Sequence, residues 1–98
     1  MNMKEIKNLL AQKLHDEGTY FTKSDIKMTK IKNGYKIIIK DYEHIPFILK
    51  TEQDEYFEFL TTIYRDDEKT CIYFEDSKRE YDLFHAILYL GYYIGSRF

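Results

Sequence analysis

Near the start of the chain, apolar residues recur every three or four positions, which is the spacing of one face of a helix. The residues that follow this spacing are Met3, Ile6, Leu10 and Leu14. The pattern predicts a helix over residues 3–16. Glycine readily adopts the left-handed conformation that commonly follows the last turn of a helix, so we expect Gly18 to end this one.

Two apolar stretches on either side of an Asn-Gly pair predict an antiparallel hairpin. The stretches cover residues 26–32 and 35–41, with Asn33 and Gly34 between them. Both residue types tolerate positive φ, which a type I′ turn requires at its two central positions. This turn would place Lys32 opposite Tyr35. A third strand is predicted over residues 45–50, where Pro46 indicates a free edge nearby because it has no N–H to donate.

The second half of the chain carries two further helical patterns with a strand between them. Residues 52–65 divide into an apolar side and a polar side, which predicts a second helix. Residues 70–75 are predicted to form a strand. A capping box at Ser77 and Glu80 predicts a third helix over residues 78–94, ended by Gly95.

The expected fold is therefore a single α+β domain over residues 1–98. Its element order is α-β-β-β-α-β-α, and its antiparallel β-meander packs on the helices in two layers. A chain of 98 residues with 44% hydrophobic residues has the size and apolar content of one globular domain. No low-complexity linker divides it.

The single cysteine and the N-terminal sequence favour a cytoplasmic protein. With Cys71 alone, the chain can form neither an internal disulfide nor a multi-thiol metal site. Residues 1–14 mix charged and apolar side chains, unlike a secretory signal. The most apolar stretch, residues 83–94, is too short to cross a bilayer.

The expected third helix is apolar on both sides, which is unusual for a surface helix. One side, assigned to the core, holds Leu83, Ile87, Leu90, Gly91 and Ile94. The opposite side holds Tyr81, His85, Leu88, Tyr89 and Tyr92. Tyrosine is enriched in the centres of interfaces because it offers a large apolar area and a hydroxyl group. This side is therefore either a surface for a protein partner or a second copy, or a second buried face, or less often part of a small-molecule pocket.

Two charged surfaces are also candidates. Residues 1–50 contain ten Lys and six acidic residues, giving +4, and residues 51–98 contain five Lys or Arg and eleven acidic residues, giving −6. An acidic surface that would attract a basic partner is predicted at Asp54, Glu55, Glu58, Asp66, Asp67 and Glu68. A lysine-rich open sheet face, which would bind nucleic acid or simply keep the sheet soluble, is predicted at Lys27, Lys36, Lys40 and Lys50.

Residues with catalytic or metal-binding potential are scattered. His15, His44 and His85 belong to three different predicted elements, with no carboxylate or cysteine at ligand spacing. The chain has no Gly-rich phosphate loop, no Gly-x-Ser-x-Gly elbow and no His-Glu-x-x-His motif. We therefore expect no enzymatic activity, no cofactor and no metal.

Together these features favour a small protein-binding module. A homodimer, or an inhibitor or accessory protein, would use the tyrosine-bearing helix face with the acidic surface as steering. Short chains rich in Lys, Ile and Tyr are typical of phages and mobile elements, so an anti-defence or host-takeover inhibitor would fit the composition. The alternative is a nucleic-acid-associated protein that uses the lysine face.

Overall fold

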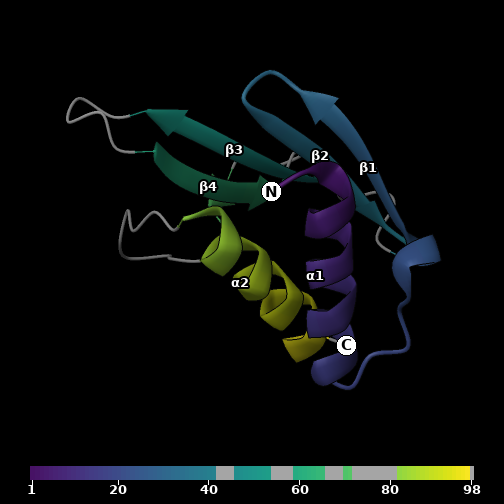
Figure 1. Ribbon diagram of the computed structural model, residues 1–98. Coiled ribbons are helices and arrows are strands. Elements are labelled where there is room, and N and C mark those ends of the chain that lie inside the picture. Colours follow the sequence, from purple (N-terminus) through teal and green to yellow (C-terminus); the bar gives the residue numbers. More distant parts are fainter. Residues whose placement is uncertain (42–45, 54–58, 66–69, 72–81, 98) are drawn as a thin grey trace.

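Two helices lie on one face of an antiparallel sheet in the computed structural model, which describes residues 1–41, 46–53, 59–65, 70–71 and 82–97 (Figure 1). The five described strands follow the order of the sequence, β1-β2-β3-β4-β5. Their bounds are β1 Ile26–Ile31, β2 Gly34–Ile39, β3 Phe47–Gln53, β4 Phe59–Arg65 and β5 Thr70–Cys71. The helices are α1 Met3–Asp16 and α2 Leu83–Ser96, with a short 3₁₀ turn, η1, at Lys23–Asp25. The predicted α+β class and the meander packed on helices are confirmed.

Helix α1 has the predicted bounds, and its ends are explained by local chemistry. The Asn2 side chain accepts a hydrogen bond from the Glu5 N–H at 2.8 Å, which satisfies one of the free donors of the first turn. Gly18 has a φ of 82° and follows the last turn, as predicted. The buried side of α1 carries Ile6, Leu10 and Leu14.

The β1–β2 hairpin forms, but its turn is one residue earlier than predicted. Ile31 pairs with Gly34, so the two loop residues are Lys32 and Asn33, and Asn33 has a φ of 62°. Lys30, not Lys32, lies opposite Tyr35. Gly34 belongs to β2 because it pairs with Ile31 and with Lys50, and it must be glycine because a Cβ there would overlap the carbonyl oxygen of Leu49 on β3.

The predicted grouping of side chains on the two sheet faces survives this error. The observed pairing differs from the predicted one by two residues, and strand side chains alternate with a period of two. Lys27, Thr29 and Ile31 therefore still share a face with Lys36 and Ile38. A shift of one residue would have exchanged the faces.

The predicted second helix is wrong. Residues 52–53 instead end β3 and residues 59–65 form β4, and the two strands pair from Phe47 opposite Arg65 to Gln53 opposite Phe59. On β4, Thr61 and Ile63 are both fully buried, and their spacing of two suits one face of a strand. The β-branched residues at 61–63 favour this conformation, and pairing with β3 outweighs the helical spacing of the apolar residues.

Helix α2 is described from Leu83, and the proposed capping box at Ser77 and Glu80 lies outside the described residues. The helix continues through Gly95 to Ser96, so the prediction that Gly95 ends it is wrong. A Cβ at Gly95 would lie 2.6 Å from the Glu17 Cβ, so this glycine allows α1 to approach closely. The predicted strand over residues 70–75 is described only at Thr70–Cys71.

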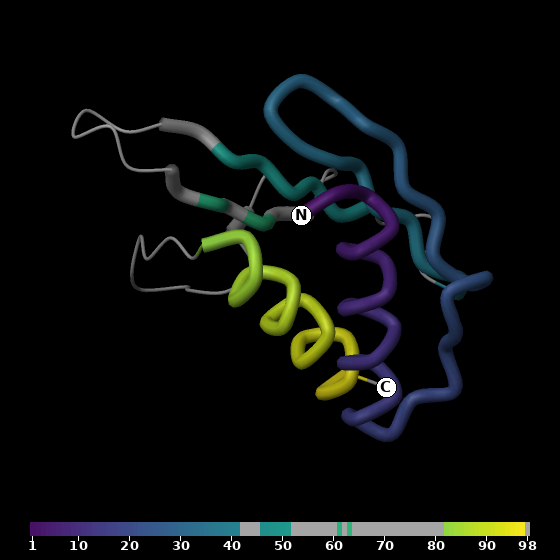
Figure 2. The backbone as a smooth tube through the Cα atoms, in the orientation of Figure 1, coloured from purple at the N-terminus to yellow at the C-terminus, as the bar shows by residue number. Residues whose placement is uncertain are grey.

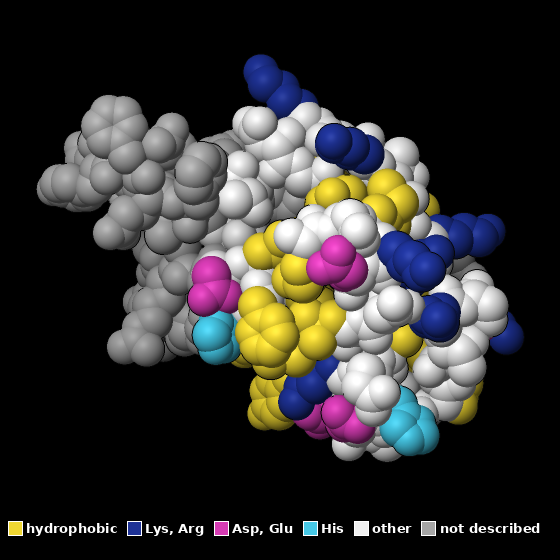
Figure 3. Space-filling view, viewed as in Figure 1, with side chains coloured by type: hydrophobic (Ala, Val, Ile, Leu, Met, Phe, Trp, Pro, Cys, Tyr) yellow, Lys and Arg dark blue, Asp and Glu magenta, His cyan; other side chains and the backbone are white. Residues whose placement is uncertain are grey.

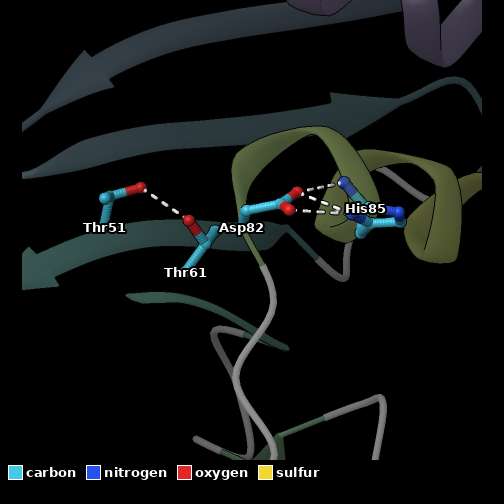
Figure 4. A network of polar contacts seen from close by, with 4 residues as sticks. All are labelled: Thr51, Thr61, Asp82 and His85. Carbon is cyan, nitrogen blue, oxygen red and sulfur yellow. Dashed lines mark hydrogen bonds and ion pairs between the residues drawn. The ribbon is translucent and has the colours of Figure 1, made fainter. Parts of the chain in front are cut away.

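The core fills the space between the two helices and the sheet. Both helices start at the same end of the molecule and run in the same general direction, as the tube in Figure 2 shows. The fully buried side chains of this core are Ile6, Leu10, Leu14, Ile26, Ile37, Ile39, Leu49, Ile63, Ile87, Leu90 and Ile94. The buried Thr61 hydroxyl has a partner in the Thr51 hydroxyl at 3.0 Å, which removes the penalty for burying it (Figure 4).

Candidate binding surface

The N-terminus of α2 is held by Asp82, which caps the helix. One carboxylate oxygen accepts from the His85 backbone N–H at 2.9 Å, and both oxygens lie 2.8 Å from His85 Nδ1 (Figure 4). The backbone hydrogen bond, followed by that of the ring, holds the pKa of Asp82 below its ordinary value. Both side chains are largely exposed, so this pair marks the solvent-facing start of the helix.

The side of α2 that faces away from the sheet carries large exposed apolar side chains. Phe84 is 48% exposed and Tyr92 is 50% exposed, with the partly buried Leu88 midway between them. These three residues are four positions apart and so share one side of the helix. Figure 3 shows hydrophobic side chains gathered over α2 and its boundary with α1. We call Phe84, His85, Leu88, Tyr89 and Tyr92 the outer face of α2.

The outer face contains no formally charged residue other than a histidine. From residue 83 to residue 96 the sequence contains no Asp, Glu, Lys or Arg. A solvated helix surface normally carries such residues. The face therefore combines exposed apolar area with little charge to desolvate.

Ring contacts link neighbouring side chains on this surface. The Phe84 ring and the His85 imidazole meet edge to face, with centroids 5.5 Å apart, and the Tyr89 and Tyr92 rings are 6.0 Å apart. Tyr89 is also partly buried against the core. These contacts restrict the side-chain rotamers, which lowers the entropy lost if a partner covers the face.

Most of the predicted partner-binding residues come together on α2. His85 and Tyr92 are exposed, whereas Leu88 and Tyr89 are partly buried, and Tyr81 lies outside the described residues. Phe84 was missed, although its spacing of four from Leu88 and eight from Tyr92 could have identified it. The residues assigned to the core side lie there as expected: Leu83, Ile87, Leu90, Gly91 and Ile94.

The core side also contains Tyr93, which the sequence did not single out. Its ring is 9% exposed and packs edge to face on Phe47, with centroids 6.0 Å apart. The Arg97 guanidinium lies 3.6 Å from the centre of the same ring, and its Nη1 donates to the Tyr93 carbonyl at 3.2 Å. Arg97 thus packs on the core side at the C-terminal end of α2.

The predicted acidic surface belongs to segments outside the part of the chain that the structure describes. Its six residues, Asp54, Glu55, Glu58, Asp66, Asp67 and Glu68, all lie outside the described residues. The first three share one side of the expected second helix. Residues 59–65 of that expected helix form a strand.

The predicted lysine face lies on the side of the sheet away from the helices. Lys27 and Lys40 are exposed and line a hollow of about 220 Å³ that also includes Asp25. Lys36 and Lys50 are only partly exposed. Within the pairing, Lys36 lies opposite Thr29 on one side and Ile48 on the other, so apolar and polar side chains separate these lysines.

Other features of the described chain add no further site. Among these residues, no three His, Cys, Asp or Glu side chains come close enough to hold a metal ion. Neither helix, over its described length, is long and apolar enough to cross a membrane. A hollow of about 430 Å³ opens between the hairpin tip and the helix N-termini, lined by residues that include Met1, Tyr35 and Leu83.

Comparisons with protein-family models, with curated proteins and with solved structures find no match for this chain. The outer face of α2 must therefore be interpreted from its own geometry.

Proposed function

We propose that this chain is a non-enzymatic protein-binding module whose contact surface is the outer face of α2. The observation that carries the proposal is the half-exposure of Phe84 and Tyr92 on a helix side without formally charged residues. Exposed aromatic side chains on one side of a rigid element are the usual anchors of protein interfaces.

The first partner we propose is a second copy of the same chain. Two outer faces brought together would bury Phe84, Leu88 and Tyr92 from each side. Because neither face carries Lys, Arg, Asp or Glu, no unpaired charge would be desolvated except where the two His85 side chains approach. Such a contact between identical surfaces gives a closed twofold dimer.

We also propose a biological setting for this binding module. The composition, rich in Lys, Ile and Tyr, supports an inhibitor or accessory protein of a phage or mobile element that acts in the cytoplasm. In that setting the outer face of α2 would cover a functional surface of a host protein, and the acidic residues of the second half of the chain would steer the encounter. Cytoplasmic location is consistent with the single Cys71.

Sedimentation equilibrium tests the homodimer directly. We expect the wild-type chain to approach twice its monomer mass of 12.0 kDa as concentration rises, and the double variant Phe84→Ala/Tyr92→Ala to remain near 12.0 kDa. The matched control is Tyr20→Ala, which removes an aromatic ring that is 60% exposed on a different part of the molecule. Circular dichroism of each variant separates lost association from lost folding.

A photocrosslinking experiment tests the binding face when the partner is another protein. Benzoylphenylalanine is placed at Phe84, and in a control chain at Tyr20, and both are irradiated in cells that express them. We expect adducts of defined mass from position 84 that are absent from position 20 and that Tyr92→Ala weakens. A chain that stays monomeric at high concentration would contradict the homodimer. Identical adduct patterns from the two positions would contradict the binding face itself.

A further inference from the structure

The edge of the sheet at β1 offers a second surface, separate from α2. In the described sheet β1 comes first in the strand order and pairs with β2 alone. Figure 1 places β1 at the margin of the sheet. An edge strand presents backbone N–H and C=O groups that a further strand can pair with.

The hairpin register identifies which backbone groups point away from β2. Ile31 and Gly34 flank a two-residue loop, and the pair next to such a loop exchanges hydrogen bonds. At the other end of the hairpin, Lys40 N donates to the Asp25 carbonyl at 2.9 Å, which continues the same alternation. The odd-numbered residues of β1 therefore bond to β2, and the even-numbered residues direct their backbone groups outward. Because the Ile26 N–H already donates to the Lys23 carbonyl of η1, the outward groups for pairing are the Ile26 C=O and the N–H and C=O of Met28 and Lys30.

The side chains around this edge are strongly basic. Residues 23–40 contain six lysines and one acidic residue. Lys27 and Lys30 are both exposed and lie on opposite faces of β1, so positive charge flanks the edge on both sides. Lys32, at the turn, is also exposed.

We propose that the β1 edge binds an extended acidic segment of a partner protein, which adds to the sheet as a sixth strand. Backbone pairing with the Ile26 C=O and with both backbone groups of Met28 and Lys30 would supply the register, and carboxylates on the added strand would pair with Lys27 and Lys30. A neutral strand would lack the charge pairing. A second copy of β1 would set lysines against lysines, which is repulsive.

Nucleic acid is the competing polyanion. It would use the same lysine charges, but its phosphates have no donors for the outward C=O groups of β1 and cannot form the alternating pairs of a strand. The two ligands therefore differ in their dependence on those groups, and a test that changes backbone pairing at constant charge separates them.

Such a test uses a fluorescein-labelled eight-residue peptide that repeats Glu-Glu-Val-Val, which places carboxylates on both faces of a strand, and two isomers of it that are N-methylated at either set of alternate residues. The three peptides have the same charge, but each methylated isomer has one strand edge blocked. We expect fluorescence anisotropy to show that one isomer binds like the parent and that the other binds at least about tenfold more weakly, because several backbone hydrogen bonds are lost. Equal binding by both isomers, or no binding of the parent at low salt, would overturn the proposal.

Charge reversal on the protein provides the second measurement. Lys27→Glu and Lys30→Glu change exposed residues, so the fold should be retained, and Lys4→Glu on α1 is the matched control. We expect the edge variants to weaken parent-peptide binding at least about fivefold and the control to leave it nearly unchanged. If Lys4→Glu has the same effect as the edge variants, or if a DNA duplex binds more tightly than the peptide, the surface is a general polyanion site and the strand-addition proposal fails.

Discussion

Gly18 and Gly34 are both required as glycines, but for different physical reasons. Gly18 has a φ of 82°, and a Cβ added there would meet no atom within 4 Å, so its constraint is conformational. Gly34 has ordinary strand geometry, and its constraint is the backbone of Leu49 on the neighbouring strand. The local sequence reveals the first constraint, whereas the second depends on how the sheet is assembled.

This difference predicts unequal costs for the same substitution. Gly18→Ala should destabilise the fold by about 1 kcal/mol, the cost of a left-handed conformation for a residue with a Cβ. Gly34→Ala should cost about 3 kcal/mol, because β2 and β3 must move apart. Urea denaturation of the two variants measures both free energies of unfolding. Equal costs would show that the close approach to Leu49 does not constrain the sheet.

Asp82 gives the helix cap a defined pH dependence. Its pKa is lowered in the folded chain, so its contribution to stability is present above the ordinary carboxyl pKa of about 3.9 and is lost as pH falls through the lowered value. Asp82→Ala should therefore reduce the stability of the protein at neutral pH but not at pH values low enough to protonate Asp82. Thermal unfolding of both proteins across this range measures the difference.

The matched control is Asp82→Asn, since asparagine caps helices about as well as aspartate but does not titrate. This variant should retain most of the stability at neutral pH and lose the pH-dependent part. A difference between wild type and Asp82→Ala that persists unchanged at the lowest pH would contradict the capping role of the carboxylate.

At the scale of elements, the contact between α1 and α2 depends on two glycines one turn apart. Gly91 faces Lys13 and Gly95 faces Glu17. Lys13 and Glu17 are themselves joined by an ion pair of 2.8 Å along α1. The absence of side chains at Gly91 and Gly95 lets the stems of Lys13 and Glu17 lie directly on α2.

This contact predicts a reversal of the usual effect of a helical glycine. In an ordinary helix interior, Gly→Ala stabilises by roughly 0.5–1 kcal/mol. At Gly91 the new Cβ would lie 2.5 Å from the Lys13 Cγ, so we expect Gly91→Ala to destabilise by about 1 kcal/mol net. Chemical denaturation measures this change.

A double-mutant cycle identifies the cause. In a Lys13→Ala background the Cγ is gone, so Gly91→Ala should cost less there than in the wild type. Lys13→Ala alone should cost only a few tenths of a kcal/mol, because its ion pair is partly exposed. Gly91→Ala that stabilises the wild-type protein would show that α1 does not press on this position.

At the scale of the whole molecule, the two layers expose surfaces of different chemistry. The outer face of α2 is apolar and lacks formal charge, whereas exposed lysines lie along the sheet and its β1 edge. A protein contact at α2 and an acidic strand at β1 would therefore occupy separate parts of the molecule. Their separation allows each proposal to be tested without disturbing the other.

The lysines of the sheet face lead to an expectation for nucleic acid. Lys36 and Lys50 are partly covered and only Lys27 and Lys40 are well exposed, so few phosphates could be contacted at once. We expect any binding of a labelled DNA duplex at low salt to be lost near physiological salt. Anisotropy titrations at two salt concentrations measure this. Tight binding at physiological salt that Lys27→Glu/Lys40→Glu weakens would instead favour the nucleic-acid function.

The sequence alone determined the features that depend on local chemistry. The bounds of α1, the left-handed Gly18, the presence of the first hairpin and the buried side of α2 all follow from residue spacing or from the conformations that Gly and Asn accept. The assignment of strand residues to sheet faces was also correct, because an error of two residues preserves the alternation.

Only the tertiary structure decided the features that depend on which segments meet. Residues 59–65 have apolar spacing that suits a helix, yet pairing with β3 and burial of Ile63 make them a strand. The sequence suggests that Gly34 lies in a turn and that Gly95 ends a helix. In the structure each position requires glycine because a neighbouring segment comes close, β3 at Gly34 and α1 at Gly95. Phe84 belongs to the outer face because α1 and the sheet cover other sides of α2. Long-range contacts of this kind set packing and exposure, and local residue spacing does not specify them.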